Sequence, residues 1–173
     1  MAKQLNVALI GQAFMGRTHS NAWSQVRRFF NPPLQPVLHT ICARDAKALR
    51  AFARRWGWQH TSTDWKRLCA DAEIDLVDIG TPNHLHAPMA RAALQAGKAV
   101  ACEKPLAGTL DDARAMRDAA KAAKLPTFVW YNYRRCPAVA LAHQLVGKGK
   151  LGEIRRVRAR YLQDWADENV PLL

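Results

Sequence analysis

The first candidate site in the sequence is a glycine-rich turn whose main chain could bind phosphate. An apolar run from Val7 to Ile10 leads into the pattern G-x-A-x-x-G. This glycine turn consists of Gly11, Gln12, Ala13, Phe14, Met15 and Gly16. In such turns the first glycine permits the tight bend and the last permits close packing of a helix, whose amino end receives the phosphates of a dinucleotide. Ala13 replaces a usual glycine, and an ordinary strand-to-helix turn without a ligand remains an alternative.

The residues after the second apolar run bear on which dinucleotide the turn would hold. The run 37–42 is followed by Ala43, Arg44 and Asp45. An acidic residue at this place binds the ribose 2′-hydroxyl of NAD, whereas a small residue with a nearby arginine accepts the 2′-phosphate of NADP. Ala43 and Arg44 favour NADP slightly, so NADP is expected to bind at least as well as NAD. Asp45 is either a ribose ligand or only the N-cap of the next helix.

A third group with chemical potential is the histidine pair His84 and His86. The H-x-H spacing suits a metal ion, but neither a cysteine nor a carboxylate cluster completes a tetrahedral set of ligands. We therefore expect no metal. His86 is expected to pack near the cofactor, and a histidine at a helix start with no functional role is an equal alternative.

Alternating elements must position these residues. Short, almost wholly apolar runs are typical of strands buried on both faces, and they occur at 7–10, 37–42, 76–79, 99–102 and 128–131. Between them lie segments of helical pattern, at 16–28, 46–56, 84–96 and 110–124, with a short helical turn at 64–68. Such alternation predicts an α/β fold, a Rossmann-type doubly wound parallel sheet.

The pattern changes after Tyr131. Residues 137–147 predict one more helix, and residues 154–162 alternate between arginines and apolar side chains, which is typical of a half-exposed strand. A lone strand cannot bury its apolar face. We therefore predict a Rossmann domain over residues 1–131, and over 132–173 the first helix and strand of a truncated C-terminal α/β domain.

Composition and charge exclude several classes of protein. The 26 Lys and Arg residues exceed the 14 Asp and Glu residues, which gives a net charge of +12, but the excess is spread along the chain. No reading helix or exposed aromatic set accompanies it, so no nucleic acid is expected as a partner. No apolar run is long enough to span a membrane, and the four cysteines form no C-x-x-C pair. We expect a cytoplasmic protein with reduced thiols.

Two further motifs make the interpretation more specific: T-P-N-H at residues 81–84 and E-K-P at residues 103–105. With the glycine turn and Y-N-Y-R-R at 131–135, they make residues 5–165 resemble the N-terminal half of the glucose-fructose oxidoreductase, inositol 2-dehydrogenase and rhizopine catabolism (Gfo/Idh/MocA) family. The resemblance implies a Rossmann domain that binds NAD or NADP, followed by an α/β domain with a large open sheet. It implies hydride transfer between nicotinamide and a hydroxyl-bearing carbon of a sugar or cyclitol.

The resemblance also implies roles for individual residues. Lys104 looks like the catalytic lysine that touches both the nicotinamide ribose and the substrate hydroxyl, where an ammonium group stabilises a developing alkoxide. The Lys104–Pro105 peptide is expected to be cis, and Glu103 to help hold the cofactor. Three residues of the T-P-N-H motif would line the ribose and nicotinamide: Thr81, Pro82 and Asn83. Arg134 would bind substrate or bridge the two domains.

One departure from the family pattern limits the expected activity. The family's acid/base pair, an Asp and a His one helical turn apart, has no counterpart after Tyr131. The chain alone is therefore expected to bind nucleotide and turn over little substrate, and a full-length form to pair as a homo-oligomer. The alternative is a non-catalytic nucleotide-binding sensor or partner-binding module, whose basic strand would contact an acidic partner or nucleic acid.

Overall fold

The computed structural model describes residues 3–162, and its centre is a six-stranded sheet with every strand parallel to its neighbours. The strands are β1 (Lys3–Ile10), β2 (Leu34–Cys42), β3 (His60–Ser62), β4 (Leu76–Ile79), β5 (Ala99–Cys102) and β6 (Thr127–Val129). Their spatial order is β3-β2-β1-β4-β5-β6. The order reverses between β1 and β4, and in open α/β sheets ligands bind outside the carboxyl ends of the strands at such a switch point.

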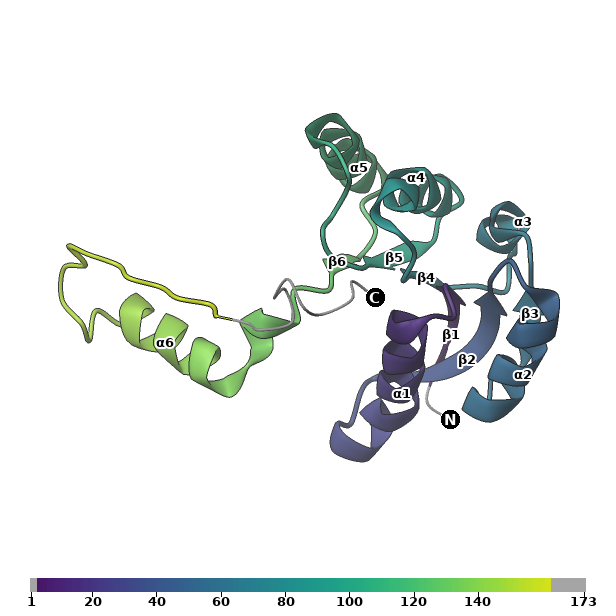
Figure 1. Ribbon diagram of the computed structural model, residues 1–173, viewed down its shortest axis with the longest axis horizontal. Coiled ribbons are helices and arrows are strands. Elements are labelled where there is room, and N and C mark those ends of the chain that lie inside the picture. The colour runs from purple at the N-terminus through teal and green to yellow at the C-terminus, as the bar shows by residue number, and fades with distance from the viewer. Residues whose placement is uncertain (1–2, 163–173) are drawn as a thin grey trace, which may run out of the picture. The chain divides into compact units, whose positions relative to one another are not determined.

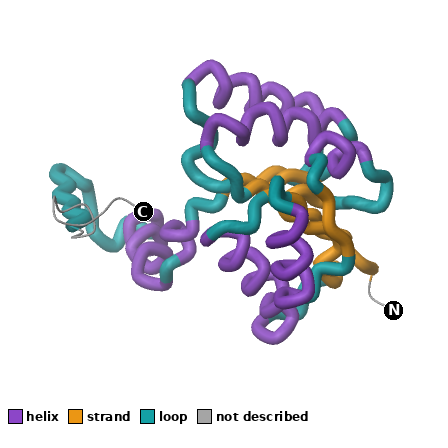
Figure 2. Tube along the Cα trace, turned by 45° about the vertical axis from the view of Figure 1, so that its right-hand side comes forward, coloured by secondary structure: helices purple, strands orange, loops and turns teal. Residues whose placement is uncertain are grey.

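Helices cover both faces of this sheet (Figures 1 and 2). One face carries α1 (Phe14–Phe29) and α2 (Ala46–Trp56), and the other carries α3 (Trp65–Ala70), α4 (His86–Gln95) and α5 (Leu110–Ala123). A short 3-10 turn, η1 (Asn83–Leu85), precedes α4. This arrangement is the doubly wound α/β fold that the sequence predicts.

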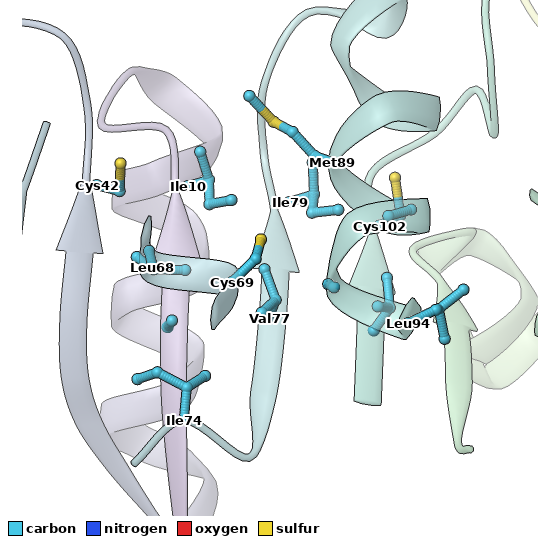
Figure 3. Packing of buried hydrophobic residues seen from close by; sticks show 14 of the residues in the cluster. Ile10, Cys42, Leu68, Cys69, Ile74, Val77, Ile79, Met89, Leu94 and Cys102 are labelled. Atoms are coloured by element: carbon cyan, nitrogen blue, oxygen red, sulfur yellow. The ribbon is translucent and has the colours of Figure 1, made fainter. Parts of the chain in front are cut away.

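The two helix layers explain why the central strands are continuous apolar runs. Along β1, Val7 and Leu9 pack into the cluster under α1 and α2, whereas Ala8 and Ile10 pack into the cluster under α3, α4 and α5. Successive side chains of a strand point to opposite faces, so a strand covered on both sides has no polar face. Figure 3 shows the cluster under α3, α4 and α5, in which Ile10 of β1 lies between Cys42 of β2 and Ile79 of β4.

The strand predictions differ from the structure at several places: β1 begins at Lys3 rather than Val7, and β6 spans Thr127–Val129 rather than 128–131. β4 and β5 have the expected bounds, but the edge strand β3 was not predicted, because His60–Ser62 is polar and only three residues long. β2 also begins before Pro36, which pairs with Leu5 of β1. Since β3 pairs with β2 only from Thr40 onward, Pro36 lies where the other edge of β2 has no strand partner, and its missing N–H removes no ladder bond.

The chain divides into two compact units between Tyr131 and Asn132. The second unit contains η2 (Asn132–Arg135) and α6 (Pro137–Gly147), and α6 has the predicted bounds. The strand predicted at 154–162 is wrong: these residues have no regular secondary structure and pair with no strand of the described chain. A strand requires a hydrogen-bonded neighbour, and residues 3–162 supply none for this segment.

Apolar side chains of the second unit remain exposed, as the alternating pattern predicts for an uncovered face. Val157 is 78% and Tyr161 66% accessible, and the Tyr161 hydroxyl lies 2.6 Å from that of Tyr133. Within residues 3–162, no helix has the length and apolar character needed to cross a membrane.

Candidate functional site

The glycine turn joins β1 to α1 at the switch point of the sheet, and two of its glycines are sterically required. Gly11 has a φ of 117°, and a Cβ there would lie 2.6 Å from the carbonyl oxygen of Gly80, which follows β4. A Cβ on Gly16 would lie 2.3 Å from the carbonyl oxygen of Gly11. The chain therefore needs a glycine at both positions to bring the ends of β1 and β4 this close.

The amino end of α1 differs from those of three other helices in having no side-chain cap. Asp45, Asp64 and Thr109 accept hydrogen bonds from first-turn amides of α2, α3 and α5, but Ala13 has no group that could do so. The first amides of α1 therefore keep their donors free of side-chain acceptors at the positive end of the helix dipole. Such an end suits an anionic group.

Gln12 supplies a second sign of fit to a ligand. Its Oε1 is buried and has no hydrogen-bond partner among the described residues. Buried acceptors are nearly always satisfied in proteins, so this oxygen is suited to a donor from outside the chain, such as a ribose hydroxyl. Together, the glycines, the uncapped helix and this acceptor fit the phosphates and ribose of a dinucleotide. Phe14 and Met15 follow in the first turn of α1, with Phe14 exposed and Met15 half-buried.

After β2, Asp45 lies at the amino end of α2 and is exposed. Its Oδ1 accepts hydrogen bonds from the amides of Lys47, at 2.9 Å, and Ala48, at 3.0 Å. Asp45 is thus the N-cap of α2. Arg44, immediately before it, is exposed.

The T-P-N-H and E-K-P motifs leave adjacent strands at the same edge of the sheet. Ile79 at the end of β4 pairs with Cys102 at the end of β5, so the two loops start side by side. In the first loop Thr81 is half-buried, whereas Pro82 and Asn83 are exposed. In the second, the Lys104–Pro105 peptide is cis, as predicted, and Lys104 is exposed.

His86 connects these two loops from within the protein. It is completely buried, with Nδ1 2.9 Å from the carbonyl oxygen of Pro105 and Nε2 2.8 Å from that of Thr81. Both ring nitrogens thus face main-chain carbonyls, and the ring lies behind the loops rather than on their exposed side. Within residues 3–162, no group of three or more His, Cys, Asp or Glu side chains is arranged to hold a metal ion.

A buried polar cluster of His19, Asp78 and Glu103 lies next to Lys104, and the sequence analysis assigned a role only to Glu103. His19 of α1 stands between two carboxylates: its Nδ1 is 2.9 Å from Oδ2 of Asp78, and its Nε2 is 3.1 Å from Oε1 of Glu103. The other oxygen of Glu103, Oε2, accepts a hydrogen bond from the Lys104 amide at 2.9 Å. All three side chains are less than a tenth exposed.

Two indole groups complete the hydrogen bonding of Asp78. Trp23 Nε1 donates to Oδ2 at 2.7 Å, and Trp130 Nε1 donates to Oδ1 at 2.9 Å. With His19, Asp78 faces three donors, which is the satisfaction that a buried carboxylate requires. A sequence signal for Asp78 was its charge inside the otherwise apolar run Leu76–Ile79.

The charges around His19 determine how readily its ring is protonated. Burial alone lowers the pKa of His19, but the hydrogen bonds and negative charges of Asp78 and Glu103 outweigh it, so the pKa is raised above its ordinary value. Only a protonated imidazole has a donor for each carboxylate. The cluster is therefore best satisfied with a cationic His19.

The buried cysteines have no nucleophilic role in this site. Burial raises the pKa of Cys42 and Cys69 to about 11 and that of Cys102 to about 12, so the thiols stay protonated near neutral pH. All three belong to the apolar cluster in Figure 3, and no disulfide involves them. They are core side chains.

Arg134 belongs to the second unit. It lies in η2 and is exposed.

The fold and the glycine turn define a dinucleotide-binding domain of the Rossmann type. Residues 5–131 match the family model described as Gfo/Idh/MocA oxidoreductase family, NAD-binding Rossmann fold. The chain belongs to this family, as its motifs suggested.

Known relatives and solved structures extend the match. The chain is 46% identical over 172 residues to the levoglucosan dehydrogenase of Pseudarthrobacter phenanthrenivorans, covering 98% of this chain and 44% of that enzyme. A crystal structure of an oxidoreductase domain protein from Kribbella flavida superposes with a TM-score of 0.91 at 51% identity, covering 95% of this chain and 44% of that one. A levoglucosan dehydrogenase in complex with NADH and levoglucosan superposes with a TM-score of 0.84 at 45% identity, covering 87% of this chain and 41% of that one. The chain thus spans less than half the length of these relatives.

Proposed function

We propose that this chain is the cofactor-binding part of an NAD(P)-dependent dehydrogenase that oxidises a hydroxyl group of a sugar or cyclitol. The observation that carries the proposal is the convergence of the uncapped amino end of α1 and the E-K-P loop on the same edge of the sheet. The proposal is also supported by the 45% sequence identity between this chain and a levoglucosan dehydrogenase whose structure contains NADH and levoglucosan.

In this proposal the main chain binds the anionic part of the cofactor. Gly11, Gln12, Ala13, Phe14 and Met15 would hold the pyrophosphate at the amino end of α1, whose first amides would donate to it. Oε1 of Gln12 accepts a ribose hydroxyl. Thr81, Pro82 and Asn83 line the ribose and nicotinamide from the loop after β4.

Lys104 is the proposed catalytic residue. A bound nicotinamide supplies the hydride acceptor. Lys104 is exposed, and its ammonium group would stabilise negative charge on the substrate oxygen while the hydroxyl proton passes to a base outside residues 3–162. Arg134 is proposed to contact the substrate. Glu103 and His86, whose polar atoms are engaged inside the protein, serve the cofactor through the main chain.

The choice between NAD and NADP depends on the loop after β2. Asp45 uses one carboxylate oxygen to cap α2, and no acid precedes Arg44 in this loop. We propose that Arg44 accepts a 2′-phosphate, so that NADP binds at least as well as NAD. The NADH complex of the related levoglucosan dehydrogenase favours NAD instead, so a direct comparison of the two cofactors is required.

Ala13→Asp tests the proposed phosphate site without disrupting the fold. Ala13 is exposed at the N-cap of α1, and aspartate is a preferred N-cap residue, so the variant should keep or gain stability. The same carboxylate would occupy the phosphate position and repel it. We expect calorimetric titration to show NADH binding to the wild-type chain and a loss of affinity of at least about 100-fold in the variant.

The matched control is Cys136→Asp, which adds the same cap to α6, another helix without a side-chain cap. It should leave the affinity for NADH unchanged. Wild-type affinity in a folded Ala13→Asp variant would refute the phosphate site.

A further inference from the structure

We infer that His19 is a positioning residue that couples α1 to the E-K-P loop: by holding Glu103 it fixes the main chain that presents Lys104. This inference rests on the proposed function, because His19 would fix the position of Lys104 relative to the dinucleotide. His19 is buried, with 6% of its surface exposed, so we infer that its effect passes through the residues it contacts.

The side chain of Glu103 spans from His19 to the Lys104 main chain. One carboxylate oxygen faces Nε2 of His19, and the other accepts the Lys104 amide. The Glu103 amide in turn donates to the carbonyl of Ile79, at the end of β4. Rotation of the Glu103 side chain would break its contacts with both His19 and the Lys104 amide.

His19 is itself held in place by its neighbours. Its other ring nitrogen faces Asp78, and Asp78 is completely buried and held by the indoles of Trp23 and Trp130. The His19 ring also packs against Trp130, with 5.2 Å between ring centroids. A chain of contacts thus runs from the rigid centre of the sheet to the Lys104 amide.

His19 lies on α1, the helix that begins at the glycine turn. Gly16 packs against Gly11, and His19 follows one turn later on the same buried side of α1. The helix that offers its amino end to phosphate therefore also fixes the loop of the proposed catalytic lysine. A shift of α1 would change the two parts of the site together.

Two substitutions separate positioning from simple support of the fold. In asparagine the amide nitrogen is two bonds from Cβ, as Nδ1 is in histidine, and in glutamine it is three bonds away, as Nε2 is. His19→Asn therefore keeps a donor for Asp78 and loses the contact with Glu103. His19→Gln keeps a donor for Glu103 and loses the contact with Asp78.

The experiment measures hydrogen exchange at the Lys104 amide in the ligand-free 173-residue chain, and the dissociation constant for NADH. We expect His19→Asn to speed exchange at Lys104 about tenfold, while the amides of β1 stay protected, and to weaken NADH binding by a similar factor. His19→Gln should rescue both quantities in large part. His39→Asn, a buried histidine elsewhere in the sheet, is the matched control and should change neither.

The outcomes are distinguishable. A folded His19→Asn variant with wild-type exchange at Lys104 would overturn the inference, and so would equal changes in both His19 variants that follow the loss of global stability. If the wild-type chain failed to bind NADH, the proposed function would fail. Exchange at Lys104 would still decide whether His19 positions this loop.

Discussion

The glycine turn and the E-K-P loop lie at the same edge of the sheet, but they are held in place in different ways. The turn is shaped by its own main chain: Gly11 and Gly16 permit contacts that no side chain would allow. The loop is held by side chains from other elements, with His19 of α1 and His86 of α4 each contacting a different part of it. The conformation of the glycine turn therefore depends on its own residues and on the adjacent end of β4, whereas that of the E-K-P loop depends on helices that pack beside it.

This difference determines what a substitution should damage. A change in the turn alters the backbone path at the switch point, so stability and ligand binding should fall together. A change in the side-chain cluster leaves the backbone path of the turn intact, so its effects should be graded. Substitutions in each of the two regions test this contrast.

Gly11→Ala should have the largest effect. The new Cβ would lie 2.6 Å from the Gly80 carbonyl oxygen, on a residue with a φ of 117°. We expect a loss of about 3–5 kcal/mol in the free energy of unfolding, with no measurable NADH binding. Urea denaturation measures the first and calorimetry the second. Gly147→Ala, where a Cβ meets nothing within 4 Å, is the control, and equal stability of the two variants would refute the steric argument.

Asp78→Asn should have the next largest effect. The amide nitrogen of asparagine would face one of the three donors that now point at the carboxylate, and His19 would lose one of its two anionic partners. We expect a loss of about 2–3 kcal/mol in unfolding free energy. Asp118→Asn, at an exposed ion pair with Arg117, should change stability little. Similar unfolding curves for both variants would show that the buried carboxylate of Asp78 contributes no more to the free energy of unfolding than an exposed one.

The stability of the fold should depend on pH through His19. Its pKa is raised in the folded protein, after burial is outweighed by Asp78 and Glu103, so folding favours the protonated ring. This contribution is complete below the unfolded pKa, near 6.5, and is lost as the pH rises through the higher folded value. Denaturation at a series of pH values from 6 upward should show declining stability that His19→Gln removes. A wild-type curve of the same shape as the variant's would contradict this assignment.

Arg44→Ala should have the smallest effect, because it changes an exposed side chain at the edge of the proposed site. We expect stability to be unchanged and NADPH to bind about five- to tenfold more weakly, with NADH binding unaffected. Titration with both cofactors measures this. An equal loss for the two would argue against a contact with the 2′-phosphate.

The same contrast explains what could be predicted from the sequence. The glycine turn and the bounds of β4 and β5 follow from short segments, because periodicity and glycine requirements are local properties. The role of His19 could not be predicted, because its partner Asp78 is 59 residues away and the sequence does not show which buried polar groups meet. The strand expected at 154–162 failed for a related reason, since a strand depends on a partner that the described residues do not supply.

The central claim is that the glycine turn and the E-K-P loop bind one dinucleotide together. The most direct test is an NMR titration of the chain with NADH, following the amides of the glycine turn and of Lys104. We predict that both sets shift with the same midpoint, while Leu5 and Val37, which lie toward the amino ends of β1 and β2, do not move. An unshifted Lys104 amide, or no shift in the glycine turn, would contradict the claim.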